Sequence, residues 1–171
     1  MDEYLLIDGY NIIYAWDELK SLAETNLDAA RLSFQDILCN YQGYKKTNVI
    51  VVYDGYKVKG NPGSITPYFN IHIIFTKEAE TADTYIEKAS NQLARKYRVT
   101  VATSDHLEQM IILGQGAMRL SANDLKAEID TVNQLIKEKY LDNKEGPKNM
   151  LFDHASPVLA NFLKKLRLQK D

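Results

Sequence analysis

Four aspartates in this sequence follow expected strands or begin an expected helix, and carboxylates gathered at one place can hold a metal ion. Asp8, Asp54 and Asp105 follow three apolar runs, and Asp83 lies in the first turn of an expected helix. Packed carboxylates repel one another and raise each other's pKa, so such a cluster needs a neutralising partner. An all-oxygen set of ligands favours Mg²⁺ or Mn²⁺, and either ion can assist the hydrolysis of a phosphodiester.

Each aspartate also has a purely structural interpretation. An aspartate after a strand is commonly a turn residue or a helix cap, and Asp54-Gly55 is itself a turn signal. The helix macrodipole favours Asp83 at a helix N-terminus without any function. Taken singly, each residue is more often structural, but their equivalent positions in the order of elements favour a shared site.

Two uncharged polar residues accompany the aspartates. Asn11 stands three residues after Asp8, and its amide can either orient a water or a phosphate or cap a helix. Ser104, beside Asp105, can either donate to a carboxylate or cap the next helix. The sequence leaves both choices open.

An alternation of strands and helices must position these residues. Continuous apolar runs predict buried strands, and apolar residues at helical spacing predict helices. The expected strands are 4–7, 49–53, 71–75 and 99–103, and the expected helices are 27–44, 82–97, 106–113, 125–140 and 158–168. Glycine and proline predict a surface loop over 56–68, and 142–157 is polar and broken.

This alternation predicts a three-layer α/β/α domain with a central, mostly parallel sheet covered on both faces. Right-handed crossovers then place the carboxyl ends of the strands at one edge, where open α/β sheets bind ligands. We expect one domain over residues 1–141. Residues 142–171 are expected to form a linker and a C-terminal helix packed on the same domain.

Composition excludes several classes of protein. Hydrophobic residues make up 45 % of the 171 and charged residues 26 %, which excludes a disordered chain. The single Cys39 fits a reducing compartment, and no apolar run approaches the ~20 residues of a membrane span. The start Met1-Asp2-Glu3 is acidic where a secretory signal is basic, so we expect a cytoplasmic protein. With a net charge of −2, a basic surface for general adhesion to nucleic acid is not expected.

Several short segments carry a resemblance to a known family. They are Leu6–Asn11, Val52–Gly55, Phe75–Glu78 with Glu80–Asp83, Ala102–Asp105 and Gly114–Ser121. In this order they resemble the YacP-like branch of the NYN domain family, in the PIN-like nuclease superfamily. The resemblance covers about residues 3 to 140.

The resemblance implies a PIN-like (Rossmann-like) fold and a Mg²⁺- or Mn²⁺-dependent endoribonuclease. In this family the catalytic metal carboxylates match Asp8, Asp83 and Asp105, with Asn11 assisting, whereas Asp54 matches a less uniform position. The chain is also similar to a bacterial endonuclease that cuts mRNA on the translating ribosome. The expected partners are therefore RNA, in particular mRNA, and the ribosome, with no membrane.

Basic residues with interleaved tyrosines provide candidate RNA contacts, because lysines can bind phosphates while tyrosines stack on bases. Most of these residues lie within the stretch 41–60, which includes the loop that leaves the strand ending at Asp54. We expect this loop to start at the active edge. The candidates are Lys45, Lys46, Tyr56, Lys57 and Lys59, with Lys77 and Arg119 elsewhere. A solvated loop without a specific partner explains these lysines equally well.

Two alternatives compete with the nuclease. A non-catalytic RNA- or ribosome-binding module with a degenerate nuclease site fits the near-neutral charge. A receiver-type phosphoacceptor domain would use Asp54 as the acceptor and Asp8 as a metal ligand. The receiver needs a lysine at the end of a later strand, and Thr103-Ser104-Asp105 offers none, so we rank it low.

Overall fold

The computed structural model describes residues 1–55, 60 and 62–143. The described strands are β1 (Glu3–Asp8), β2 (Asn48–Tyr53), β3 (Ser64–Tyr68), β4 (Ile71–Phe75), β5 (Arg98–Ala102) and β6 (Met118–Leu120). The described helices are α1 (Gly9–Ala15), α2 (Asp17–Thr25), α3 (Leu27–Lys45), α4 (Ala82–Leu93), α5 (His106–Gly114) and α6 (Ala122–Asp142).

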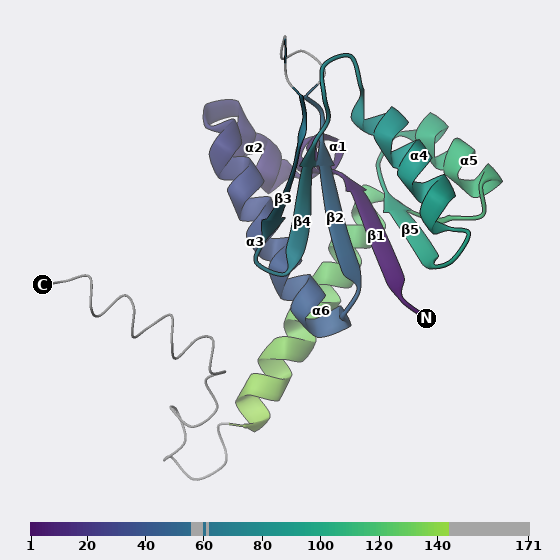
Figure 1. Cartoon of the computed structure of the whole chain (residues 1–171). Helices are drawn as coiled ribbons and strands as arrows, with labels where there is room; N and C mark the ends of the chain where they lie inside the picture. Colours follow the sequence, from purple (N-terminus) through teal and green to yellow (C-terminus); the bar gives the residue numbers. More distant parts are fainter. Residues whose placement is uncertain (56–59, 61, 144–171) are drawn as a thin grey trace, which may run out of the picture. The chain divides into compact units, whose positions relative to one another are not determined.

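The strands form one sheet in the order β3-β4-β2-β1-β5-β6 (Figure 1). Every neighbouring pair is parallel except β3 and β4, which are antiparallel. The predicted mostly parallel sheet is therefore confirmed. Because β1, β2, β4, β5 and β6 run the same way, their carboxyl ends share one edge, which we call the carboxyl edge.

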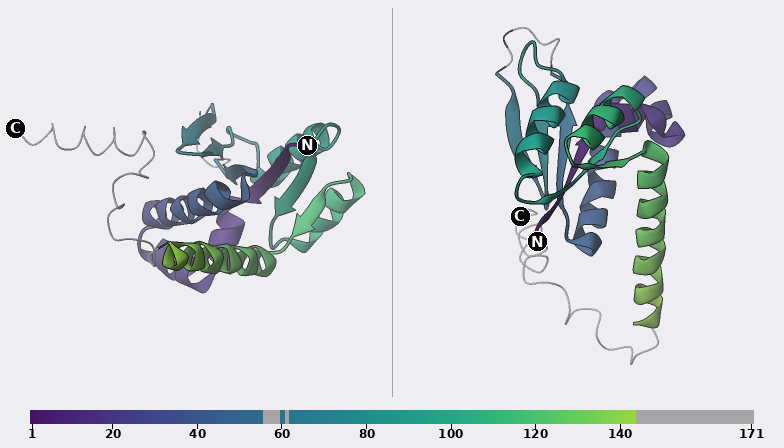
Figure 2. Two further views of the ribbon diagram at one scale, coloured as in Figure 1. Left: turned by 90° about the horizontal axis from the view of Figure 1, so that it is seen from below. Right: turned by 90° about the vertical axis from the view of Figure 1, so that its right-hand side faces the viewer.

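Helices cover both faces of the sheet, as predicted for an α/β/α domain (Figures 1 and 2). Successive side chains of a strand point to opposite faces. Leu6 of β1 and Val52 of β2 belong to a core cluster with Ile86 of α4 and Ile112 of α5. The neighbouring residues of these strands point to the opposite face, where α1 and α3 contact β2. This alternation assigns each candidate residue of a strand either to the face of the sheet covered by α4 and α5 or to the face covered by α1 and α3.

The outer strands and two helices were missing from the sequence-based prediction. The expected loop over 56–68 contains β3, whose residues are exposed apart from the half-buried Tyr68, so no buried run announced the strand. Pro67 is tolerated there because an edge strand has one side without a partner. The three-residue strand β6 and the short helices α1 and α2 were also not predicted. Helix α4 ends at Leu93 rather than near residue 97.

The helix caps follow the sequence closely. Thr81 caps α4, accepting a hydrogen bond from the backbone N–H of Thr84 at 3.2 Å. Ser121 caps α6, where its Oγ accepts from the N–H of Asp124 at 3.1 Å. Both caps satisfy backbone donors that a helix N-terminus otherwise leaves free.

The chain forms two compact units, Met1–Asn133 and Gln134–Asp171, with the border inside α6. The first unit holds the sheet and the candidate site. The structure describes no residue from 144 onward, so the helix expected over 158–168 and most of the expected linker lie outside the described residues. Their packing stays a prediction. No helix in the described ranges is long and apolar enough to cross a membrane.

Candidate metal centre

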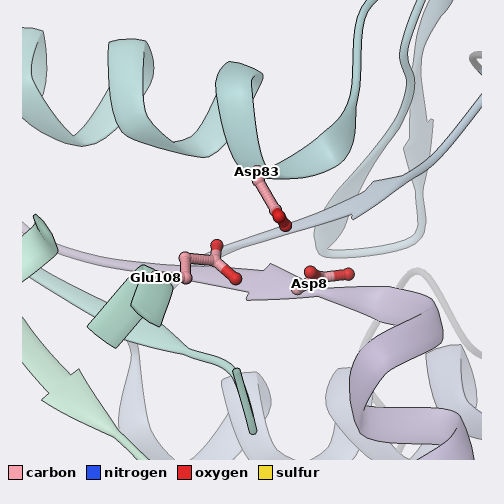
Figure 3. Close-up of side chains that lie close together, drawn as sticks. All are labelled: Asp8, Asp83 and Glu108. Carbon is pink, nitrogen blue, oxygen red and sulfur yellow. The ribbon is translucent and has the colours of Figure 1, made fainter. Parts of the chain in front are cut away.

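Three carboxylates from three elements meet at the carboxyl edge (Figure 3). Asp8 ends β1, Asp83 lies in the first turn of α4, and Glu108 lies in the first turn of α5. One carboxylate oxygen from each lies within 4.8 Å of the other two. Since Leu6 faces α4 and α5, the alternation of side chains brings Asp8 to the same face, where the other two residues lie.

Local hydrogen bonds place each of the three residues. Asp8 caps α1 through Oδ1, which accepts from the N–H of Asn11 at 3.5 Å. The cap at Thr81 starts α4 just before Asp83. Asp105 accepts at Oδ1 from the N–H of Glu108 at 3.3 Å, so it begins α5 and sets Glu108 in the first turn. The cluster therefore depends on how three helices begin.

Burial and mutual repulsion raise the pKa of two of these carboxylates. Burial, helped by the hydrogen bond and charge of Asp83, raises the pKa of Asp8 from 3.8 to about 7. Burial and the charge of Asp8 raise the pKa of Glu108 from 4.5 to about 8. A hydrogen bond from Thr103 Oγ1 to Glu108 Oε2, 2.8 Å long, lowers it in part. The cluster thus favours either a shared proton or a cation.

Glu108 Oε1 gives a direct test of whether a cation suits this place. The atom is buried, and no hydrogen-bond partner for it is found within the described residues. A buried acceptor without a donor is costly, and a hard divalent cation would satisfy it. The residues present therefore fit Mg²⁺ or Mn²⁺, with Asp8, Asp83 and Glu108 as the groups that would hold it.

Asn11 and Ser104 form a connection beside the cluster. The Asn11 carbonyl oxygen accepts from the backbone N–H of Ser104 at 2.5 Å and from the Ser104 hydroxyl. The contact ties α1 to the loop between β5 and α5, which carries Asp105. Both residues lie at the carboxyl edge as expected, and their roles in catalysis stay predictions.

Asp105 stands three residues before Glu108 in the sequence, but it is not one of the three clustered carboxylates. Its side chain caps α5, and its backbone N–H donates to Thr103 Oγ1 at 3.1 Å. Its expected role as a metal ligand stays a prediction. Glu108 was not predicted from the sequence, because it does not directly follow an expected strand. The available signal was its place one helical turn after Asp105.

Asp54 and Lys77 also lie at the carboxyl edge. Asp54 follows β2, is exposed, and its charge contributes to the raised pKa of Asp8. Lys77 follows β4 and is exposed. Arg119 lies in β6 and is exposed, one residue before that strand ends. These positions leave Lys77 and Arg119 as candidates for phosphate contact.

The remaining RNA candidates fall elsewhere. Lys45 ends α3 and Lys46 is its C-cap, just before β2 begins, so both lie at the sheet edge opposite Asp8. The loop expected at the active edge begins only after Asp54, at the other end of β2, so it does not include these two lysines. Their contact with RNA stays a prediction. Tyr56, Lys57 and Lys59 lie outside the described residues.

The fold and the site together define an α/β domain of the PIN-like kind, with an acidic cluster at the carboxyl edge of its sheet. The model of the YacP-like NYN domain matches residues 5–168. The chain therefore belongs to the YacP-like NYN domain family, whose domain is a PIN-like nuclease domain, and it has a nuclease-type function.

Known proteins support this assignment over most of the chain. The Bacillus subtilis (strain 168) protein YacP, described as uncharacterized, is 43 % identical over 140 residues, or 80 % of this chain and 81 % of that protein. The crystal structure of Rae1 (YacP) from Bacillus subtilis matches with a TM-score of 0.70 and 40 % identity, over 98 % of this chain and 95 % of that one. A single-residue mutant of Rae1 matches with a TM-score of 0.74 and 38 % identity, over 86 % and 87 % of the two chains.

Proposed function

We propose that this protein is a Mg²⁺- or Mn²⁺-dependent endoribonuclease that hydrolyses phosphodiester bonds of RNA at the carboxyl edge. The observation that carries the proposal is the convergence of Asp8, Asp83 and Glu108 around one point, with a buried oxygen of Glu108 that lacks a donor. When bound there, the ion would supply a Lewis acid for the hydrolysis of a phosphodiester.

The residues of the chain have separate tasks in this proposal. Asp8, Asp83 and Glu108 would hold the ion, and Thr103 fixes the orientation of Glu108 through its hydroxyl. The contact of Asn11 with Ser104 keeps the start of α5 beside the start of α1, and so keeps Glu108 close to Asp8. Asp105 supports the same geometry as the cap of α5.

We further propose that the substrate is mRNA, that cleavage takes place in association with the ribosome, and that the protein works in the cytoplasm. This part of the proposal is supported by the family resemblance of the motifs around Asp8, Asp83 and Asp105, with the single Cys39 as support for a reducing compartment.

Cleavage of a labelled mRNA tests the proposal directly. The RNA is incubated with protein and Mn²⁺ or Mg²⁺, with and without translating ribosomes, and the products are separated on a gel. We expect internal cleavage by the wild type and its loss in Asp8→Asn and Glu108→Gln. Asp130→Asn is the matched control, because it removes a charge from an exposed aspartate of α6 outside the cluster.

The outcomes separate the two functions considered from the sequence. RNA that stays intact in every condition, or equal cleavage by wild type and Asp8→Asn, would refute the metal-dependent nuclease. Sedimentation with ribosomes that survives both substitutions, without any cleavage, would instead favour a non-catalytic RNA- or ribosome-binding module.

A further inference from the structure

An arginine and three aromatic rings form a second cluster at the carboxyl edge. The guanidinium carbon of Arg31, in α3, lies 6.0 Å from the ring centroid of Tyr10, 6.0 Å from that of Tyr53 and 5.6 Å from that of Phe75. Tyr53 ends β2 and Phe75 ends β4, so the rings stand at the same edge as Asp8. We call these four residues the Arg31 cluster.

The guanidinium is fixed in place, and the Arg31 side chain stays partly exposed. Its Nη1 donates to the hydroxyl of Tyr10 at 2.7 Å, and Nη2 pairs with Asp28 one turn earlier in α3. The Arg31 side chain is 21 % exposed. A guanidinium has five N–H donors, and the structure records no further partner for the rest within the described residues. Donors therefore remain for a ligand.

A short and tightly packed connection joins this cluster to the carboxylates. Tyr10 is the second residue after Asp8, and the two clusters lie on opposite faces of the sheet at one edge. Gly9 between them packs against Tyr53, because a Cβ at Gly9 would lie 2.6 Å from the Tyr53 Cδ1 atom. The position of Arg31 relative to Asp8 is therefore set by the rings that pack around Arg31 and by the short segment 8–10, which links Asp8 to Tyr10.

We propose that Arg31 binds a backbone phosphate of single-stranded RNA beside the cleavage position, an inference that rests on the proposed nuclease function. The carboxylates and Asp54 give this edge a negative charge that repels RNA, so a substrate needs a cation nearby. A guanidinium matches a phosphate in charge and in the geometry of its donors. Because the rings and Tyr10 already hold Arg31, little side-chain freedom is lost when a phosphate binds.

Salt-dependent binding of a short labelled RNA tests this proposal. Fluorescence anisotropy is measured in EDTA, over a range of salt concentrations, for the wild type, Arg31→Gln, Arg31→Lys and Tyr10→Phe. Arg98→Gln is the matched control, because Arg98 also forms an ion pair, with Glu3 at 3.0 Å, but at the opposite edge of the sheet. Thermal melting of each variant is recorded in the same buffer.

We expect Arg31→Gln to weaken binding about tenfold, or about 1.4 kcal/mol. The slope of log K against log salt should fall by about 0.7, the value for one phosphate contact on a single strand. Arg31→Lys should keep the slope but bind more weakly, because lysine keeps the positive charge but lacks the planar guanidinium with its fixed set of N–H donors. Tyr10→Phe should weaken binding without changing the slope, and Arg98→Gln should match the wild type.

A merely structural role for Arg31 predicts a different result. Arg31→Gln would then melt at a lower temperature, yet bind RNA with the affinity and salt slope of Arg98→Gln, and that result would overturn the proposal. If Arg31→Gln does not fold, Arg31→Lys and Tyr10→Phe decide: wild-type affinity in both overturns it. A wild type that binds RNA through Arg31 but never cleaves would end only the nuclease proposal.

Discussion

Replacing Asp8 by asparagine should stabilise the metal-free protein at alkaline pH. Asparagine keeps the shape of the side chain and its ability to cap α1, but it removes a buried charge that faces Asp83 and Glu108. The raised pKa of Asp8 means that the folded state binds a proton more tightly than the unfolded state does. Stability is therefore unaffected below about pH 4 and falls as the pH rises towards about 7.

The size of this effect follows from the two pKa values. The rise from 3.8 to about 7 corresponds to roughly 4 kcal/mol above pH 7, since one pKa unit is worth about 1.4 kcal/mol. The charges of Asp8 and Glu108 affect each other, so the two contributions cannot simply be added. We therefore expect Asp8→Asn to raise the free energy of unfolding by about 2–4 kcal/mol at pH 8. For a chain of this length the gain corresponds to roughly 5–15 °C in Tm. At pH 5 the gain should be less than half as large.

Thermal melts in EDTA at pH 5 and pH 8 measure both gains, with Asp130→Asn as the exposed control. Added Mn²⁺ should raise the Tm of the wild type and not that of Asp8→Asn, because the ion needs ionised carboxylates. The reasoning would be refuted if Asp8→Asn melted at or below the wild type at pH 8 in EDTA. An equal difference at the two pH values would refute it as well.

Three further substitutions test how the site is supported. Gly9→Ala should lower the free energy of unfolding by about 1–3 kcal/mol and reduce activity, because its Cβ would lie 2.6 Å from Tyr53 Cδ1. Chemical denaturation measures this loss, and unchanged stability would contradict the close packing of Gly9 against Tyr53. Thr103→Val should weaken Mn²⁺ binding several-fold by calorimetry, since Glu108 loses its donor, while Thr103→Ser should retain it; equal loss in both would contradict a role of the hydroxyl. Ser121→Ala should cost about 1 kcal/mol through the lost cap of α6, without any effect on Mn²⁺ affinity.

The sequence predicted the central elements because their signals are local. The apolar runs that became β1, β2, β4 and β5 are buried along most of their length, and their alternation with helices was enough to predict a parallel sheet. The edge strands gave no such signal. Strand β3 is almost wholly exposed and β6 has only three residues, so neither shows a buried run.

The candidate site was predictable where it coincided with a strand end or a helix start. Asp8 and Asp83 were found in this way, and the structure brings them together. Glu108 was missed because its place depends on the cap at Asp105, which turns the first turn of α5 towards the cluster. The position of Arg31 over three rings depends on contacts between distant segments, and no spacing in the sequence reveals it.

The first strand of the chain lies in the middle of the sheet, between β2 and β5. A chain under synthesis therefore makes Asp8 early but lacks the strand on one side of it until most of the first unit has been made. Glu108 is made later still, on α5, so a partly synthesised chain holds no complete set of carboxylates. Under the proposed function, the topology keeps the nascent chain without a complete metal site while it is still attached to the message that encodes it.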